Sequence, residues 1–578
     1  MHKTSALGCK KLNGREFEQD AQNLEIFQTA YRDEIFFRKT FLVLKPKTAP
    51  FKIAPMSHLV WKSISIAAVF LIVIVNHVQA AQQSAPSPSN QLRVQAECER
   101  LLSAPPTHSF PRTYHIMPRL FKGGLNGIEA ELPNLKRLGI DAIWLGPVHP
   151  QTLDVHYYLE NGETRSTLND HGYWVADHGA VDSNLGGEAA FERLLNTAQS
   201  LGIKVLLDIP VNHMGYGDEL QFGGRSIVPS ERPELFLQGR GLVAADYEHF
   251  ESLESADELV AKQEEISQMR LMGLNDLNHA HPEVREYLLR SYKKFIDMGV
   301  SGFRVDAVKH LPIEFLVWFV NSLDQYGQRH HQDLIFLLEF LTHRERTFEV
   351  FSEQILARLK NPQNVFMIDF PLQSYLRSTH WNTQLLGEVV EFLKVNRGSD
   401  RAWSSHYIPM FVDHDFGGPL PHPMSELLVH VIGDFSSQQP TMIHHGSEQS
   451  GHLQSGRQHV DFLKANGDIG QVLKGIHRGR HKIDPQGLGV NVHIWGVFEG
   501  VTVIEQEGTH GHQYLFATMQ DSSSHLIWQL PKEIATRLKL QQQMFLSGEA
   551  KWNVDLDGTL NLSLPDKGFA ILSSVQAP

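Results

Sequence analysis

The hydrophobic and polar positions after residue 113 follow two alternating patterns. Short β-branched or apolar runs are separated by stretches in which apolar residues recur at helical spacing. Two clear helical stretches begin after Ala130 and after Ala189, and the second leads to Gly202, a residue typical of helix C-termini. Strands that alternate with helices indicate βαβ units around a parallel sheet.

Eight of the apolar runs are predicted to be strands. They are YHIMP (114–118), AIWLGPV (142–148), KVLLDIPV (204–211), GFRVD (302–306), LIFLLEF (334–340), VFMIDFP (365–371), YIPMFVD (407–413) and PTMIHHG (440–446). Eight parallel strands with intervening helices predict an α/β fold, a closed (β/α)₈ TIM barrel. In such a barrel, chemistry takes place at the carboxyl ends of the strands.

Two segments depart from the barrel pattern, which we expect over residues 108–213 and 273–485. Residues 214–272, after the third strand, are too long for an ordinary connection and are predicted to form an inserted subdomain, domain B. Residues 486–578 carry short strands with polar turns, which predict a C-terminal antiparallel β-domain. Its clearest runs are QYLFATM, SHLIWQL, TLNLSL and GFAILSS.

The amino-terminal region carries an export signal. The apolar run Ile64–Val75 is typical of the central part of a secretory signal peptide, and Met56 stands where such a peptide begins. We therefore interpret residues 1–55 as a doubtful extension, 56–80 as the signal peptide and 81–107 as a linker. The expected protein is secreted or periplasmic, without stable membrane insertion after cleavage. An uncleaved signal anchor is the alternative.

Composition narrows the classes of ligand. Lys and Arg total 52 against 65 for Asp and Glu, a net charge of -13, so a nucleic acid is not an expected partner. The two cysteines, Cys9 and Cys98, match no zinc or redox spacing and cannot form a disulfide framework. The composition instead favours a neutral or cationic small molecule, or an uncharged polymer, as the ligand.

Polar residues at the ends of four predicted strands form a candidate site. The third strand contributes Asp208, Asn212 and His213, the fourth Arg304, Asp306, Lys309 and His310, the fifth Glu339, and the seventh His414 and Asp415. Each acid alone could cap a helix or pair with an arginine. Three acids at one barrel mouth repel, however, and the pKa of one of them rises unless a cation intervenes.

Acid/base chemistry on an acetal requires such a division between carboxylates. In a retaining glycosidase, an ionised carboxylate attacks the sugar carbon and a protonated one, about 5–5.5 Å away, donates to the leaving oxygen. Arg304 stands two residues before Asp306 on one strand, so both side chains point to the same side, and we expect Arg304 to keep Asp306 ionised.

These four segments resemble, in order, the four short sequence blocks of the α-amylase superfamily of glycoside hydrolases, the retaining enzymes of family 13 type. Similar segments are HGYWVADHGAVDSNLGG from His171, GLNDLNHAHPEV from Gly273, and GSEQ at 446–449. The resemblance spans roughly residues 110–480. It implies a barrel with domain B after the third strand, and a substrate that is an α-glucan or a maltooligosaccharide.

The resemblance also implies roles for individual residues. Asp306 would be the nucleophile, Glu339 the general acid/base, and Asp415 the carboxylate that orients the sugar. Substrate-binding residues would be Tyr173 as a platform, His213, Arg304 and His414 as hydrogen-bonding partners, Lys309 and His310 on the acceptor side, and Arg457 after the eighth strand.

The resemblance further implies a structural calcium ion, bound by the Asn212 side chain and the backbone carbonyl of His310. Calcium takes six to eight oxygen ligands, and these two are the ones the sequence indicates. The alternative is that Asn212 bonds the backbone of the inserted segment. No organic cofactor is expected.

Three departures from the family pattern surround the predicted sugar-binding positions. Asp413 replaces an asparagine two residues before Asp415, His444-His445 replace a tyrosine pair, and Leu453 stands where an acid usually precedes Arg457. We expect these changes to alter specificity more than activity.

Hydrolysis is the favoured reaction, and transglycosylation or isomerisation on the same substrates is the alternative because the covalent intermediate is shared. A non-catalytic glucan-binding relative would typically have lost one of the acids, whereas all three are present.

Overall fold

The computed structural model describes residues 109–575, except for 161–162, 379–391, 394, 396–403, 416–422, 450–454, 461–466, 488, 519, 521, 531–534, 536–541, 547–549 and 556. The interpretations of residues 1–55, 56–80 and 81–107, and both cysteines, lie outside the described residues. Within the described part of the chain, no helix is long and apolar enough to cross a membrane.

Eight parallel strands form one sheet in the order β13-β12-β11-β10-β5-β2-β1-β14. Their bounds are β1 (Thr113–Ile116), β2 (Ala142–Leu145), β5 (Lys204–Ile209), β10 (Gly302–Val305), β11 (Ile335–Leu338), β12 (Val365–Ile368), β13 (Tyr407–Ile408) and β14 (Ile443–His444). A parallel bridge between Met410 and Met442 joins the two ends of this sheet. Each predicted run overlaps one of these strands, so the predicted (β/α)₈ sheet is confirmed.

Successive side chains of the strands face two different cores. Trp144, Leu206, Leu337 and Phe366 belong to one buried cluster, which consists mainly of strand residues and fills the barrel. The residues between them on the strands, such as Ile143, pack with the apolar faces of the helices in a second cluster. Both faces are therefore buried, which explains why these strands are nearly continuous apolar runs.

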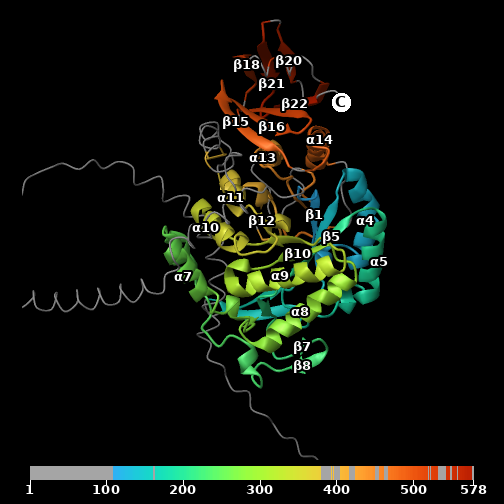
Figure 1. Cartoon of the computed structure of the whole chain (residues 1–578), viewed down its shortest axis with the longest axis vertical. Coiled ribbons are helices and arrows are strands. Elements are labelled where there is room, and N and C mark those ends of the chain that lie inside the picture. Colours follow the sequence, from blue (N-terminus) through green and yellow to red (C-terminus); the bar gives the residue numbers. More distant parts are fainter. Residues whose placement is uncertain are drawn as a thin grey trace, which may run out of the picture. The chain divides into compact units, whose positions relative to one another are not determined.

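Helices cover the outer face of the sheet, as Figure 1 shows for α4, α5, α8 and α9. Their bounds are α4 (Gly124–Leu138), α5 (Gly187–Ser200), α8 (Pro282–Asp297), α9 (Ile313–Arg329), α10 (Glu345–Leu356), α11 (Phe370–Ser378), α13 (Pro423–Phe435) and α14 (Asp468–Ile483). Helix α5 ends at Ser200, and the expected glycine, Gly202, follows two residues later with a φ of 62°. A β-carbon is unfavourable in this left-handed conformation, so glycine suits the position.

The segment between β5 and β10 contains a hairpin and two helices. The hairpin consists of β7 (Leu220–Phe222) and β8 (Arg225–Ile227), and the helices are α6 (Ala244–Ser252) and α7 (Ala256–Ile266). At its base, β6 (His213–Met214) pairs with β9 (Asn275–Asp276). A second hairpin, β3 (Val155–Glu160) and β4 (Glu163–Leu168), follows β2. This hairpin was not among the elements predicted from sequence, and its second strand, ETRSTL, is mainly polar.

The C-terminal strands form two antiparallel sheets, ordered β15-β16-β17-β22-β19 and β18-β21-β20. Their bounds are β15 (Asn491–Phe498), β16 (Val501–Gly508), β17 (Gly511–Thr518), β18 (Ser524–Gln529), β19 (Gln542–Leu546), β20 (Lys551–Val554), β21 (Thr559–Leu564) and β22 (Phe569–Val575). A separate buried cluster that includes Val503, Phe516, Leu526 and Leu562 joins the two sheets. The predicted antiparallel C-terminal region is confirmed.

Candidate active site

The buried guanidinium of Arg304 lies at the centre of the strand ends. Its Nη1 contacts Asp208 Oδ1 at 2.8 Å and Asp306 Oδ1 at 2.6 Å, and its Nη2 contacts Glu339 Oε1 at 2.7 Å. Strand register explains the arrangement, because Arg304 on β10 is level with Asp208 on β5 and Leu337 on β11. Two terminal nitrogens of one side chain therefore hold the carboxyl groups of Asp306 and Glu339.

The backbone after Asp306 adds a second link between these two acids. Ala307 has a φ of 50°, in the left-handed region that a non-glycine residue enters at a cost of about 1–3 kcal/mol. In this conformation, the Ala307 N–H donates to Glu339 Oε2 at 2.7 Å. The Val308 N–H donates to the Glu339 carbonyl at 2.9 Å. The chain is strained at the point where it connects the two predicted catalytic acids.

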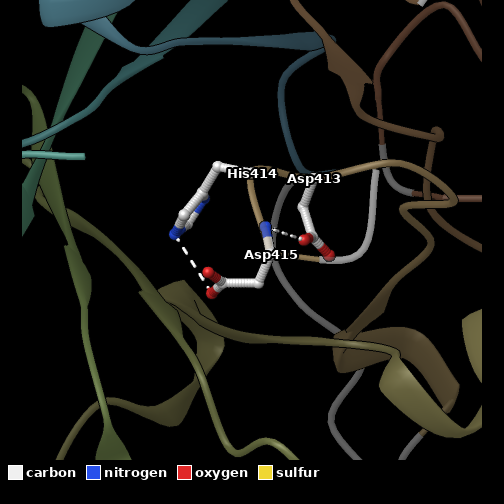
Figure 2. A group of neighbouring side chains, drawn as sticks. All are labelled: Asp413, His414 and Asp415. Carbon is white, nitrogen blue, oxygen red and sulfur yellow. Dashed lines mark hydrogen bonds and ion pairs between the residues drawn. The ribbon is translucent and has the colours of Figure 1, made fainter. Parts of the chain in front are cut away.

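Asp415 lies in a separate group of polar contacts on the loop after β13. His414 Nε2 is 3.2 Å from Asp415 Oδ2, and the Asp415 N–H donates to Asp413 Oδ1 at 2.8 Å, as Figure 2 shows. Asp413 also accepts a hydrogen bond from Gln373. The acid that replaces the expected asparagine therefore anchors the backbone of Asp415.

Arg457 reaches the same carboxylate from the loop after β14. Its Nη2 lies 2.8 Å from Asp415 Oδ1, and its Nε donates to the His414 carbonyl at 3.2 Å. Its Nη1 lies 3.7 Å from Asp170, an acid just before Gly172 and Tyr173. Asp170 thus supplies a negative charge beside Arg457, where the sequence has Leu453 in place of the usual acid. The polar run NDHGYW was the available signal for Asp170.

Burial and neighbouring charges shift the pKa values of the three acids in different directions. Burial raises the pKa of Asp306 to about 7 and that of Glu339 to about 8, although Arg304 lowers both. Arg304 does not keep the pKa of Asp306 low, as was expected from sequence, because burial outweighs its attraction and Asp208, which shares the same guanidinium, raises the pKa of Asp306 further. Burial also acts to raise the pKa of Asp415, but His414 and Arg457 hold it well below its ordinary value.

Tyr173 joins the two groups of acids. Its hydroxyl donates to Asp208 Oδ2 at 2.8 Å, and its ring stacks on the His414 ring with centroids 5.2 Å apart. His213 Nε2 lies 3.1 Å from the Tyr173 carbonyl and must carry the proton there, because a carbonyl only accepts. Burial lowers the pKa of His213 to about 4, so this imidazole is neutral near pH 7. Tyr173, His213, Arg304 and His414 are therefore brought together.

Lys309 and His310 are directed toward the segment inserted between β5 and β10. Both are buried, and Lys309 Nζ lies 3.6 Å from Glu251 Oε1 on α6. The His310 ring packs edge-on against Tyr247, with ring centroids 5.8 Å apart. The described contacts of these two side chains are therefore with helix α6.

Two buried histidines lie beneath the site, and their contacts fix which of their ring nitrogens carry a proton. His444 Nε2 contacts the Gly456 carbonyl at 2.7 Å and must donate, so His444 Nδ1 accepts from His115 Nδ1 at 2.9 Å. His115 also stacks on Trp144, with ring centroids 3.6 Å apart. The sequence analysis missed His115, although it lies within a predicted strand. His444, the first of the two histidines that stand in place of the expected tyrosine pair, is therefore held by His115 and the Gly456 carbonyl.

Two groups of oxygen or nitrogen ligands are possible cation sites. The ligand atoms of Asp413, His414 and Asp415 lie within 4.8 Å of one another, but each side chain already has a protein partner. At the base of the inserted segment, Asn212 Nδ2 donates to Asp276 Oδ2 at 2.8 Å. The buried Oδ1 atoms of Asn212 and Asp276 have no hydrogen-bond partner in the described part of the chain.

The buried Asp276 carboxylate is the feature that the sequence analysis did not assign. Burial raises its pKa to about 8, because its hydrogen bonds to Asn212 and the Leu271 N–H only partly compensate for lost hydration. Asp276 lies within the quoted block GLNDLNHAHPEV, so the signal was present. Asn212 bonds this side chain, and its carbonyl accepts from the Leu277 N–H.

Residues 89–368 match the family model "Alpha amylase, catalytic domain", and this part of the chain belongs to the α-amylase family. Asp306 and Glu339 lie within the match, whereas Asp415 and Arg457 lie beyond it. The chain is homologous to α-amylase-family glycosidases and transglycosylases.

Individual relatives illustrate this range. Over 211 residues, the chain is 27% identical to a cyclomaltodextrin glucanotransferase of Klebsiella oxytoca, covering 36% of this chain and 30% of that protein. Over 213 residues, it is 29% identical to an α-glucosidase of Pediococcus pentosaceus, covering 34% of this chain and 35% of that protein. The chain thus matches about a third of the length of these relatives. An Anoxybacillus α-amylase structure shares the fold, with a TM-score of 0.61 at 19% identity over 81% of this chain and 98% of that chain.

Proposed function

We propose that the protein is a retaining α-glucosidic hydrolase that acts on α-glucans or maltooligosaccharides. The observation that carries this proposal is the attachment of Asp306 and Glu339 to the two ends of one buried guanidinium. Two carboxyl groups held by one guanidinium, both with a raised pKa, support a double-displacement mechanism, in which one acts as a nucleophile and the other as an acid.

In the first step, the Asp306 carboxylate attacks the anomeric carbon while the Glu339 carboxyl gives its proton to the departing glycosidic oxygen. The bond to the leaving sugar breaks as the glycosyl bond to Asp306 forms. In the second step, Glu339 takes a proton from water, whose oxygen replaces Asp306 at the same carbon. Burial raises the pKa of both carboxyl groups, so one of the pair can hold the proton that the leaving oxygen needs while the other remains an anion.

Asp415 remains an anion throughout this cycle, because His414 and Arg457 hold its pKa low. A fixed carboxylate can accept hydrogen bonds from sugar hydroxyls, and these bonds strengthen as the ring distorts toward the oxocarbenium ion. Tyr173 supplies an aromatic face for the same sugar. Its hydroxyl bond to Asp208 fixes the ring, so little side-chain entropy is lost on binding.

Matched variants test this function. Wild type should shorten maltoheptaose, and mass spectrometry should detect only smaller sugars. Asp306→Asn and Glu339→Gln should each lower the rate about 10³-fold, because each removes a group that acts in the transition state. Equal background rates for all three proteins would support a glucan-binding protein instead. Longer products would indicate transfer to a sugar hydroxyl, the reaction named for the Klebsiella oxytoca relative.

We also propose that Asn212 and Asp276 would hold a structural calcium ion, with the His310 carbonyl as a further ligand. The support is chemical: within the described residues, two buried oxygens lack hydrogen-bond partners, and one of them belongs to a carboxylate whose pKa burial raises despite the charge of Arg270. The ion, when bound, would supply the missing positive charge between the barrel and the inserted segment. Because the ion would bind the folded protein and not the unfolded chain, added calcium should raise the melting temperature.

A further inference from the structure

Helices α6 and α7 contact both loops that follow the strands carrying the two proposed catalytic acids. Gln263 on α7 donates from Nε2 to the carbonyls of Lys309 at 3.1 Å and Leu311 at 2.8 Å. Arg344, on the loop after β11, donates from Nη1 to the Leu253 carbonyl, just past the end of α6, at 3.0 Å. The inserted segment is therefore attached to the loop after β10 and to the loop after β11.

One carboxylate connects these two loops directly. Glu251 Oε1 lies 3.6 Å from Lys309 Nζ, and Glu251 Oε2 accepts a hydrogen bond from Thr342 Oγ1 at 2.8 Å. Lys309 stands three residues after Asp306, and Thr342 stands three residues after Glu339. The Glu251 carboxylate thus connects the loop after the proposed nucleophile to the loop after the proposed acid/base.

The surroundings make this bridge stronger than a surface ion pair. The side chains of Lys309 and Glu251 are only 3% and 11% exposed, so water screens their attraction weakly. The Lys309 ammonium also lies over the rings of Tyr247 and Phe250, at 5.2 and 5.5 Å from their centroids. Removing one partner of a buried pair leaves the other charge without compensation, which is strongly unfavourable.

We propose that Glu251 is a positioning residue that keeps Glu339 in register with Asp306 by tying Lys309 to Thr342. This proposal rests on the proposed function, because register matters only if both carboxyl groups act on one glycosidic bond. Two carboxyl groups of a retaining enzyme must stay about 5–5.5 Å apart. A displacement of about 1 Å can cost about 10²-fold in rate.

Two substrates separate this effect from general damage to the protein. Cleavage of maltoheptaose needs a proton from Glu339, whereas α-glucosyl fluoride has a leaving group that departs without one. The value of kcat/KM for each substrate reports the glycosylation step, and their ratio does not depend on the fraction of folded enzyme. A misplaced Glu339 should therefore lower the ratio of kcat/KM for maltoheptaose to kcat/KM for the fluoride.

Glu251→Ala should lower this ratio about 10²-fold, and Glu251→Gln about tenfold, because the amide still accepts from Thr342 but no longer neutralises Lys309. The matched control is Glu254→Gln, three residues away, which pairs with Arg344 through a side chain that is 74% exposed. Such an exposed pair contributes little, so the ratio should stay at the wild-type value.

An unchanged ratio in Glu251→Gln would overturn the proposal, and this variant decides the matter if Glu251→Ala does not fold. A ratio that falls equally in Glu254→Gln would also overturn it, because the effect would then belong to the inserted segment in general and not to the Glu251 bridge. Failure of the wild type to turn over either substrate would instead reject the proposed function itself.

Discussion

Replacing His445 tests how strongly burial in the folded protein disfavours the charged form of an imidazole. This side chain is fully buried on the loop after β14, and burial together with the nearby His414 and His459 lowers its pKa to about 3. In the unfolded chain, the same imidazole has a pKa of about 6.5. Replacement by phenylalanine removes the titrating group and keeps a planar ring.

The sign follows from proton binding. Between pH 6.5 and about 3, the unfolded chain binds a proton at His445 and the native protein does not, so native stability falls as the pH falls. At pH 5, a pKa gap of this size makes the unfolded state about 2 kcal/mol more favourable. At pH 7, the same contribution is only about 0.2 kcal/mol. His445→Phe should therefore lose about 2 kcal/mol less stability than wild type between pH 7 and pH 5.

Urea unfolding at both pH values measures this double difference, in which the pH-independent packing cost of the substitution cancels. Phe366→Leu is the control: it changes a buried ring without a titrating group, so its cost should be the same at both pH values. Equal acid sensitivity of wild type and His445→Phe would refute the reasoning, because His445 would then take up its proton in the native state.

Three further predictions concern the site directly. A plot of kcat/KM against pH should be bell-shaped, falling below about pH 7 as Asp306 gains a proton and above about pH 8 as Glu339 loses one. The two apparent pKa values belong to the coupled pair of carboxyl groups. A flat profile from pH 6 to 9 would contradict this. Asp170→Asn should shift stability by less than about 1 kcal/mol but raise KM about tenfold, because Arg457 loses its second anion; steady-state kinetics showing a loss in kcat alone would exclude this role. Calcium added after chelation should raise the melting temperature of wild type and not of Asp276→Asn, and equal shifts would place the ion elsewhere.

The barrel was predictable from sequence because its strands are buried on both faces. Runs such as LIFLLEF and VFMIDFP are nearly continuous apolar segments between amphipathic helices, and few other folds require that alternation. The convergence of Asp306 and Glu339 followed from the same topology, since parallel strands place their carboxyl ends at one rim.

Contacts between distant loops were not predictable in this way. Glu251 lies on a short, mainly polar helix of an inserted segment, and nothing in its local pattern indicates Lys309 or Thr342 as partners. Asp170 likewise precedes Gly172 on a polar loop and meets Arg457 only in the folded chain. The pKa of Asp306 depends on how many carboxylates share Arg304, a number that is visible only in three dimensions.

Trapping the covalent intermediate would identify the carboxylate that attacks the sugar. Glu339→Gln treated with α-glucosyl fluoride should form the glycosyl–enzyme bond without acid assistance but release it slowly, because no base activates water. Peptide mass mapping should then find one hexosyl group on the peptide that contains Asp306, and none in Asp306→Asn. Labelling at another carboxylate, or turnover by the wild type that inverts the anomeric configuration, would contradict the account.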